Sequence, residues 1–116
     1  MFRIGDPRVV SDDEIIRGIR RPGKFDATVA CEAEARRLVL EALPGVVELP
    51  RARAGQTYPS PPPGVLLRYQ VRPAEPEVGN DLPHLKYEDW TRGKKKNGGS
   101  WGHLFFPPAT SDCVAQ

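Results

Sequence analysis

The spacing of apolar residues changes at Pro44-Gly45, and this change limits the possible folds more than any other feature of the chain. After it, apolar and polar residues alternate, most clearly in "GVLLRYQVRP", which is the period of a β-strand. Before it, apolar residues recur at helical spacing, and Asp26 is in a position to cap the helix that they predict over 27–43. The residues with this spacing are Cys31, Ala35, Leu38, Val39, Ala42 and Leu43.

A second helix and several strands are predicted on either side of this boundary. The stretch "SDDE" at 11–14 has the form of a capping box and predicts a helix over 12–20. Strands are predicted over 46–49, 65–72, 84–90 and 100–106. The 13 prolines and 11 glycines favour long loops over a helical bundle. We therefore expect an α+β domain in which two N-terminal helices pack on a roughly four-stranded antiparallel sheet.

The length and the cysteines indicate how this domain is organised. A chain of 116 residues is expected to form one domain over 1–116, with loose ends at 1–10 and 108–116. The two cysteines, Cys31 and Cys113, are too few for a disulfide framework and are expected to be reduced, with Cys31 filling the core. The chain has no apolar run of membrane-spanning length, and its first twenty residues lack the apolar core of a signal peptide.

The segment "LPHLKYEDWTRGKKKNGGSWGHLFF", residues 82–106, concentrates the unusual side chains. It contains both histidines, both tryptophans and every lysine except Lys24. It has five Lys and Arg against two Asp and Glu, while the rest of the chain has 12 against 13. The positive charge is therefore local, as expected for a polyanion-binding site.

This segment is predicted to form a hairpin with the charged residues on one face. If Trp90 lies opposite Trp101, then Tyr87 faces Leu104, and Leu85 faces Phe106 on the apolar side. The other face is expected to be solvent-exposed. It carries His84, Lys86, Glu88 and His103, joined by Arg68, Gln70 and Arg72 if the 65–72 strand pairs alongside.

Such a face has the groups needed to cleave RNA. One of the two imidazoles, His84 and His103, can take the proton of a 2′-hydroxyl while the other protonates the leaving oxygen. Lys86 or Arg68 can stabilise the charge on phosphorus, so neither a metal nor a cofactor is required. An acid and base pair of this kind predicts a bell-shaped dependence of activity on pH. Residues around the face are expected to bind nucleic acid through phosphate contacts or base stacking: Arg68, Arg72, Trp90, Arg92, Lys94, Lys95, Lys96 and Trp101.

The runs "YQVRPAEP" and "EVGNDLPHLKYEDWTRGKKKNGGSWGHLFF" resemble the C-terminal toxin modules of bacterial polymorphic toxins of the Rhs and contact-dependent type. The order of elements is similar to the fold shared by barnase, EndoU nucleases, tRNA-cleaving colicins and RelE. This resemblance implies a metal-independent ribonuclease with active residues on the sheet face. By type and predicted position, these are His84, Lys86, Ser100 and His103.

The resemblance also implies how such a domain would operate. It would be secreted or delivered as part of a larger toxin, act on RNA in the cytoplasm of the target cell, and be monomeric and independent of membranes when free. The producing cell would need an acidic immunity protein, which we expect to cover 92–96 and the histidines.

Two other classes of function fit the same residues. In a non-catalytic module that binds nucleic acid or protein, the tryptophans and lysines would bind while the histidines had no chemical role. In another toxin-type enzyme, the domain would act on nucleotides or proteins, although no paired-cysteine motif supports a zinc deaminase.

Overall fold

The computed structural model describes residues 11–53, 55 and 60–108, and in this part the predicted α+β class is confirmed. Loose ends were predicted at 1–10 and 108–116, and all of these residues except Pro108 lie outside the described residues. The elements, in chain order, are α1 (Asp12–Arg20), β1 (Gly23–Thr28), α2 (Glu32–Ala42), β2 (Val47–Glu48), β3 (Leu67–Arg72), the 3₁₀ turn η1 (Pro76–Val78), β4 (His84–Asp89) and β5 (Ser100–Phe105).

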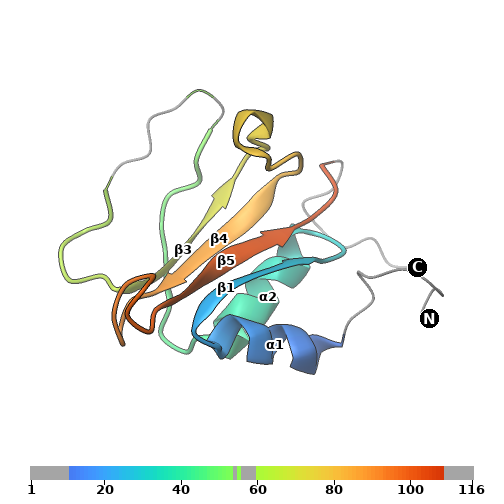
Figure 1. Cartoon of the computed structure of the whole chain (residues 1–116). Coiled ribbons are helices and arrows are strands. Elements are labelled where there is room, and N and C mark those ends of the chain that lie inside the picture. Colours follow the sequence, from blue (N-terminus) through green and yellow to red (C-terminus); the bar gives the residue numbers. More distant parts are fainter. Residues whose placement is uncertain (1–10, 54, 56–59, 109–116) are drawn as a thin grey trace.

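The sheet has five strands in the order β1-β5-β4-β3-β2 and is mixed (Figure 1). The two central pairs, β3–β4 and β4–β5, are antiparallel. The two outer pairs, β1–β5 and β2–β3, are parallel. The prediction of four antiparallel strands was therefore wrong at both edges of the sheet, because edge partners distant in the sequence cannot be identified from local alternation.

The strand β1 occupies residues that were predicted to lead into a helix. Phe25 and Ala27 pack against the core, while Lys24 and Asp26, between them in the sequence, are exposed. This alternation belongs to a strand, so Asp26 does not cap α2. The helix begins later, after Cys31, whose Sγ accepts a hydrogen bond from the backbone N–H of Glu34 at 3.4 Å.

Cys31 is buried, as predicted, but it is not reduced. It has no exposed surface and is disulfide-bonded. The other cysteine, Cys113, lies outside the described residues. The expectation of reduced thiols was wrong because spacing along the sequence does not show which thiols meet in space.

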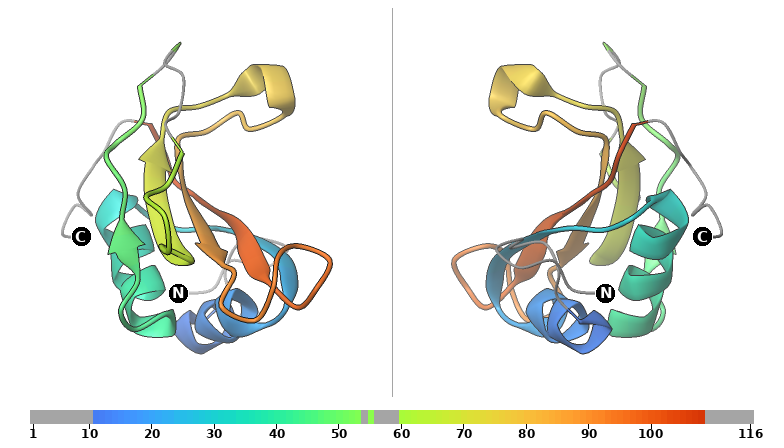
Figure 2. Two further views of the ribbon diagram at one scale, coloured as in Figure 1. Left: turned by 90° about the vertical axis from the view of Figure 1, so that its left-hand side faces the viewer. Right: turned by 90° about the vertical axis from the view of Figure 1, so that its right-hand side faces the viewer.

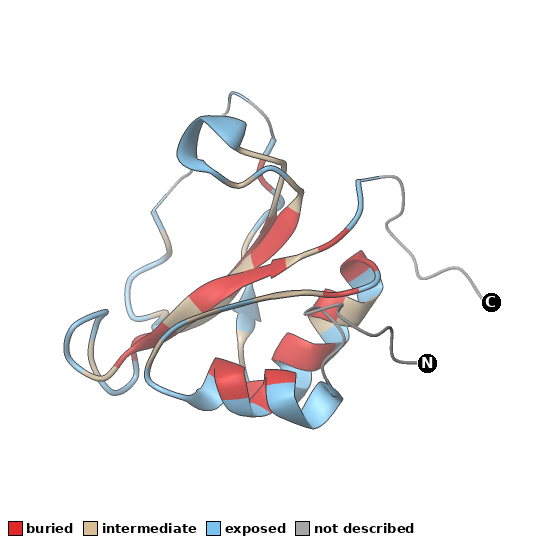
Figure 3. Ribbon diagram, turned by 45° about the vertical axis from the view of Figure 1, so that its right-hand side comes forward, coloured by how far each residue is buried: buried red, intermediate tan, exposed pale blue. Residues whose placement is uncertain are grey.

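The hydrophobic core lies between the two helices and one face of the sheet. Figure 2 shows both helices on the same side of the sheet, and Figure 3 shows the buried parts of the helices turned toward the strands. The predicted capping box is present, since Ser11 and Glu14 exchange hydrogen bonds at 3.1 Å. The predicted packing is confirmed by the buried residues Ile15, Ile16, Ile19, Ala35, Leu38, Val39, Leu43, Tyr69, Val71, Leu85, Tyr87 and Leu104. Neither described helix is long and apolar enough to span a membrane.

The hairpin forms as predicted, but its register differs by two residues. His84 pairs with Phe105 and Glu88 with Trp101, so Trp90 and Trp101 are not partners. A shift of two leaves every side chain on its predicted face, because side chains alternate with period two. Gly102 shows why β1 fits beside β5: a Cβ there would lie 1.7 Å from the carbonyl oxygen of Phe25.

Candidate functional site

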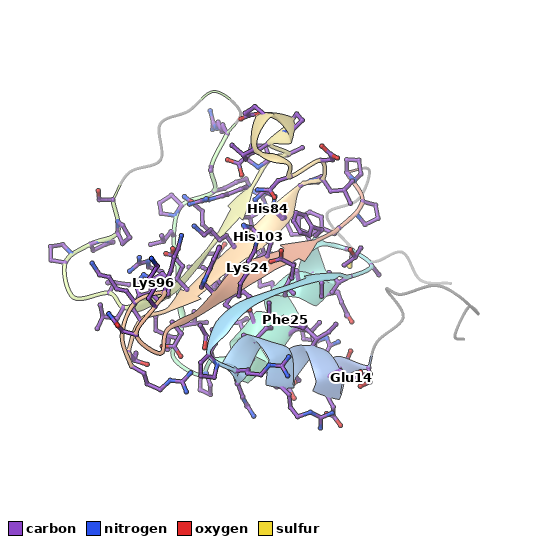
Figure 4. All side chains as sticks on the ribbon, viewed as in Figure 1. Glu14, Lys24, Phe25, His84, Lys96 and His103 are labelled. Atoms are coloured by element: carbon purple, nitrogen blue, oxygen red, sulfur yellow. The ribbon has the colours of Figure 1, made fainter. Side chains whose placement is uncertain are left out.

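The sheet face turned away from the helices carries the polar cluster, which we call the histidine face. Figure 2 shows the η1 turn and the β4–β5 loop projecting on this side, and Figure 4 shows His84, His103 and Lys24 together there. Cross-strand pairing brings Lys86 beside His103, and Arg72 beside His84. The histidine face consists of Lys24, Asp26, Arg68, Gln70, Arg72, His84, Lys86, Glu88, Trp101, His103 and Phe105.

His103 and Asp26 form a dyad across the β1–β5 pair. The Nδ1 atom of His103 lies 2.9 Å from Oδ1 of Asp26, which also accepts the backbone N–H of His103 at 3.0 Å. Since a carboxylate only accepts, Nδ1 carries the hydrogen and Nε2 has a free lone pair in the neutral ring. Nε2 makes no hydrogen bond within the described residues and is not among their buried unpartnered atoms. This geometry suits a general base.

His84 lies beside the dyad but in a different environment. The two imidazole rings are 5.2 Å apart between centroids, edge to face. His84 has no exposed surface, and its Nδ1 donates to the carbonyl oxygen of Leu82 at 3.0 Å. Its Nε2 lies 3.2 Å from Oε1 of Glu75 without the alignment of a hydrogen bond. The prediction that both histidines face solvent was therefore wrong. The residues before β4 cover His84, and His103 is also largely buried, at 8% exposure.

Burial lowers the pKa of His84 below 6.5, against the opposing effect of its hydrogen bond to Leu82. Electrostatic interactions with His103 and Arg72 lower this pKa further, and Glu75 raises it. The neutral ring is therefore favoured near neutral pH. This disfavours His84 as the proton donor in a symmetrical pair of histidines.

The lowered pKa of His84 predicts a loss of stability in mild acid. The unfolded chain protonates this ring near pH 6.5, while the folded chain does so only at lower pH, so the free energy of unfolding falls as pH drops below 6.5. The loss is at most about 1.4 kcal/mol per pH unit and should disappear in His84→Asn, whose amide can still donate to Leu82. Urea unfolding between pH 7.5 and pH 5 measures this, and an equal loss in the variant would contradict it.

A chain of alternating charges crosses the histidine face from β3 to β4. Glu88 accepts from Arg68 Nε at 2.8 Å and lies 3.4 Å from Lys86 Nζ. Burial acts to raise the pKa of Glu88, but Lys86 and Arg68 outweigh it and the pKa is lowered. Burial also lowers the pKa of the Lys86 ammonium, which Glu88 only partly offsets. Lys86 can therefore release its proton more readily than an exposed lysine.

Trp101 is surrounded by cations. The Nζ atoms of Lys95, Lys24 and Lys86 lie 4.3, 5.2 and 5.9 Å from its ring centroid. The Trp101 ring is in turn 6.0 Å from that of His103. Its half-buried position beside three ammonium groups suits a site where a base stacks and a phosphate is neutralised.

Two predicted site residues lie away from the histidine face. Ser100 is buried on the opposite side of β5, where its hydroxyl donates to the carbonyl oxygen of Arg21 at 2.8 Å. Arg92 donates to Ser100 Oγ and to the carbonyl oxygen of Arg20, both at 3.0 Å. These contacts attach the end of α1 to the hairpin, so the structure separates both residues from the histidines.

The remaining predicted contacts divide between the histidine face and its margin. Arg72 lies beside His84 and donates to Gln70 at 2.9 Å. Trp90 lines a pocket of about 590 Å³ together with the lysines of the β4–β5 loop, Lys94, Lys95 and Lys96. Figure 4 shows Lys96 at the margin of the sheet.

Sequence reasoning missed Lys24, Asp26 and Glu75. Asp26 was interpreted as a helix cap, and the alternation of Lys24, Phe25, Asp26 and Ala27 was the signal that could have assigned it to a strand. The proximity of Glu75 to His84 had no signal in the sequence. Among the described residues, no group of three or more His, Cys, Asp and Glu side chains is placed to hold a metal ion.

Comparison with protein families, with curated proteins and with solved structures found no match to this chain.

Proposed function

We propose that this domain is a metal-independent ribonuclease in which His103 is the general base. The observation that carries the proposal is the contact between His103 Nδ1 and Asp26 Oδ1 at 2.9 Å, which directs the free Nε2 lone pair away from the dyad. Asp26 keeps the imidazole in one tautomer and stabilises the imidazolium formed when the base takes a proton. The ammonium groups near Trp101 supply the charge that a phosphodiester substrate requires.

The proposed reaction is a transesterification within the RNA. His103 Nε2 takes the proton of a 2′-hydroxyl, the 2′-oxygen bonds to phosphorus, and the bond from phosphorus to the 5′-oxygen breaks. The leaving oxygen takes a proton from an acid, for which Lys86 is better placed than His84. Lys86 pairs with His103 across the strands, and burial lowers its pKa, while His84 is favoured as the neutral ring. The products are a 2′,3′-cyclic phosphate and a free 5′-hydroxyl.

The direct test is incubation of the purified domain with single-stranded RNA in EDTA. The expected result is cleavage to fragments with cyclic phosphate ends, and no cleavage of the same sequence carrying 2′-O-methyl groups, which lack the nucleophile. Intact RNA, or cleavage that only added metal restores, would contradict the proposal.

A binding module without catalysis is the second candidate, and the environment of Trp101 favours it. Three ammonium groups around one indole ring can hold a nucleic acid without any reaction. The EDTA assay separates the two candidates, since a binding module would retain the RNA and leave it intact.

The proposal includes a toxin role for the domain, delivered by a larger protein into the cytoplasm of a target cell. The disulfide at Cys31 supports passage through an oxidising compartment, where disulfides persist. A cell that makes such an enzyme must block it, and an acidic immunity protein would fit the positive charge of Lys94, Lys95 and Lys96.

We predict that alanines at Lys94, Lys95 and Lys96 weaken the complex with this immunity protein. The affinity at low salt should fall about tenfold or more, mainly through slower association, because exposed charges at an interface steer the encounter. Surface plasmon resonance at two salt concentrations measures the effect. Arg17→Ala on the exposed side of α1 is the control, and equal weakening by both variants would place the partner elsewhere.

A further inference from the structure

A pocket beside the histidine face has walls of two kinds. It lies between residues 61–66 and the β4–β5 loop and has a volume of about 590 Å³. Pro61, Pro62, Val65, Leu66 and Trp90 form its apolar wall, and Arg68, Lys94, Lys95 and Lys96 supply its positive charge. None of the described residues that line it is acidic.

The apolar wall is built around Trp90. Its indole ring packs against Gly99, where a Cβ would lie 2.5 Å from Cε3, so one side of the ring is held by the loop backbone. Leu66 is 46% exposed at the pocket, and its carbonyl oxygen accepts the backbone N–H of Trp90 at 2.8 Å. Trp90 is only 8% exposed, so Leu66 rather than the indole ring offers apolar surface to a ligand.

The pocket is connected to the histidine face by direct contacts. Lys95 lines the pocket and also lies 4.3 Å from the Trp101 ring centroid, and Trp101 lies next to His103. Trp90 directly follows β4 and is four residues from Lys86, or about 13 Å along an extended chain. A ligand in the pocket can therefore belong to the same extended molecule as one at His103.

We propose that this pocket binds one nucleotide of a single-stranded RNA, away from the cleaved linkage. The base lies against the exposed side chain of Leu66, and its phosphate is held by Lys94 and Lys96. A nucleotide combines the flat apolar surface and the negative charge that these walls complement. A single strand is required because a paired and stacked base could not enter. This proposal rests on the ribonuclease function and adds a subsite that positions the substrate.

The test measures binding without cleavage, using a fluorescently labelled ten-nucleotide 2′-O-methyl RNA and anisotropy. Leu66→Glu should weaken binding about tenfold or more, because it removes an apolar contact with the base and places a carboxylate beside the phosphate. Leu40→Glu is the matched control, because Leu40 is 47% exposed and lies on α2. It should bind like the wild type.

A second variant makes the test independent of how well Leu66→Glu folds. Replacing Lys94 and Lys96 with alanine should make the negative slope of log affinity against log salt shallower, by about 0.7 for each phosphate that the protein no longer neutralises. Unchanged binding by Leu66→Glu, together with an unchanged slope in the lysine variant, would overturn the proposal. The proposal would also be overturned if Leu66→Glu abolished binding of the immunity protein but left RNA binding unchanged. The pocket would then be a protein interface.

Failure of the subsite and failure of the ribonuclease function give different results. The anisotropy probe reports the subsite alone, and cleavage of ordinary RNA in EDTA reports the ribonuclease function. Cleavage of RNA without any effect of the pocket variants on binding would contradict the subsite but not the ribonuclease function. Binding that the pocket variants weaken, without cleavage of ordinary RNA, would support the subsite and contradict the ribonuclease function.

Discussion

Cleavage of single-stranded RNA is expected to fall about 10²–10⁴-fold when His103 is replaced with alanine, the range for loss of a general base. Asp26→Asn should lower kcat with little change in KM, because Asp26 orients the imidazole and stabilises its charged form without contacting the substrate. Steady-state cleavage in EDTA measures both. The control is Asp13→Asn, the same substitution at an exposed carboxylate on α1.

Comparing the activities of variants at the two histidines tests whether His103 and His84 have different roles. If His103 is the base and Lys86 the acid, His84→Asn should keep far more activity than His103→Ala at matched stability. Equal losses would support the symmetrical pair of histidines that the sequence suggested. Full activity in His103→Ala would contradict the proposed mechanism.

The largest expected effect on stability is at Leu38, in the centre of the core. Leu38→Ala should lower the free energy of unfolding by about 2–5 kcal/mol, because it leaves a cavity between α2 and the sheet. Leu40→Ala is the control, two residues away on the same helix, and should change stability by less than about 0.5 kcal/mol. Leu38 has no exposed surface, whereas Leu40 is 47% exposed.

Urea unfolding followed by circular dichroism measures both variants. A similar cost at the two positions would mean that α2 does not pack on the sheet through this side. The assignment of the histidine face to the side without helices would then be wrong as well.

The amino-acid sequence by itself determined which side chains share a face. Strand alternation placed His84, Lys86 and His103 on one face. This prediction was correct although the predicted register was wrong by two residues, because side chains alternate with a period of two along a strand. The helix over Asp12–Arg20 and the buried side of α2 were likewise predictable, since capping and helical spacing are local properties of the chain.

Only the tertiary structure decided what each histidine can do. Asp26 lies 77 residues from His103 in the sequence, and it joins the site because β1 adds to the sheet edge beside β5. His84 is buried under the residues that precede β4, so burial and Glu75 separate its chemistry from that of His103. Parallel edge pairing and burial depend on contacts between distant segments. No periodicity in the sequence reports them, which is why two histidines that appear equivalent in the sequence have different environments in the fold.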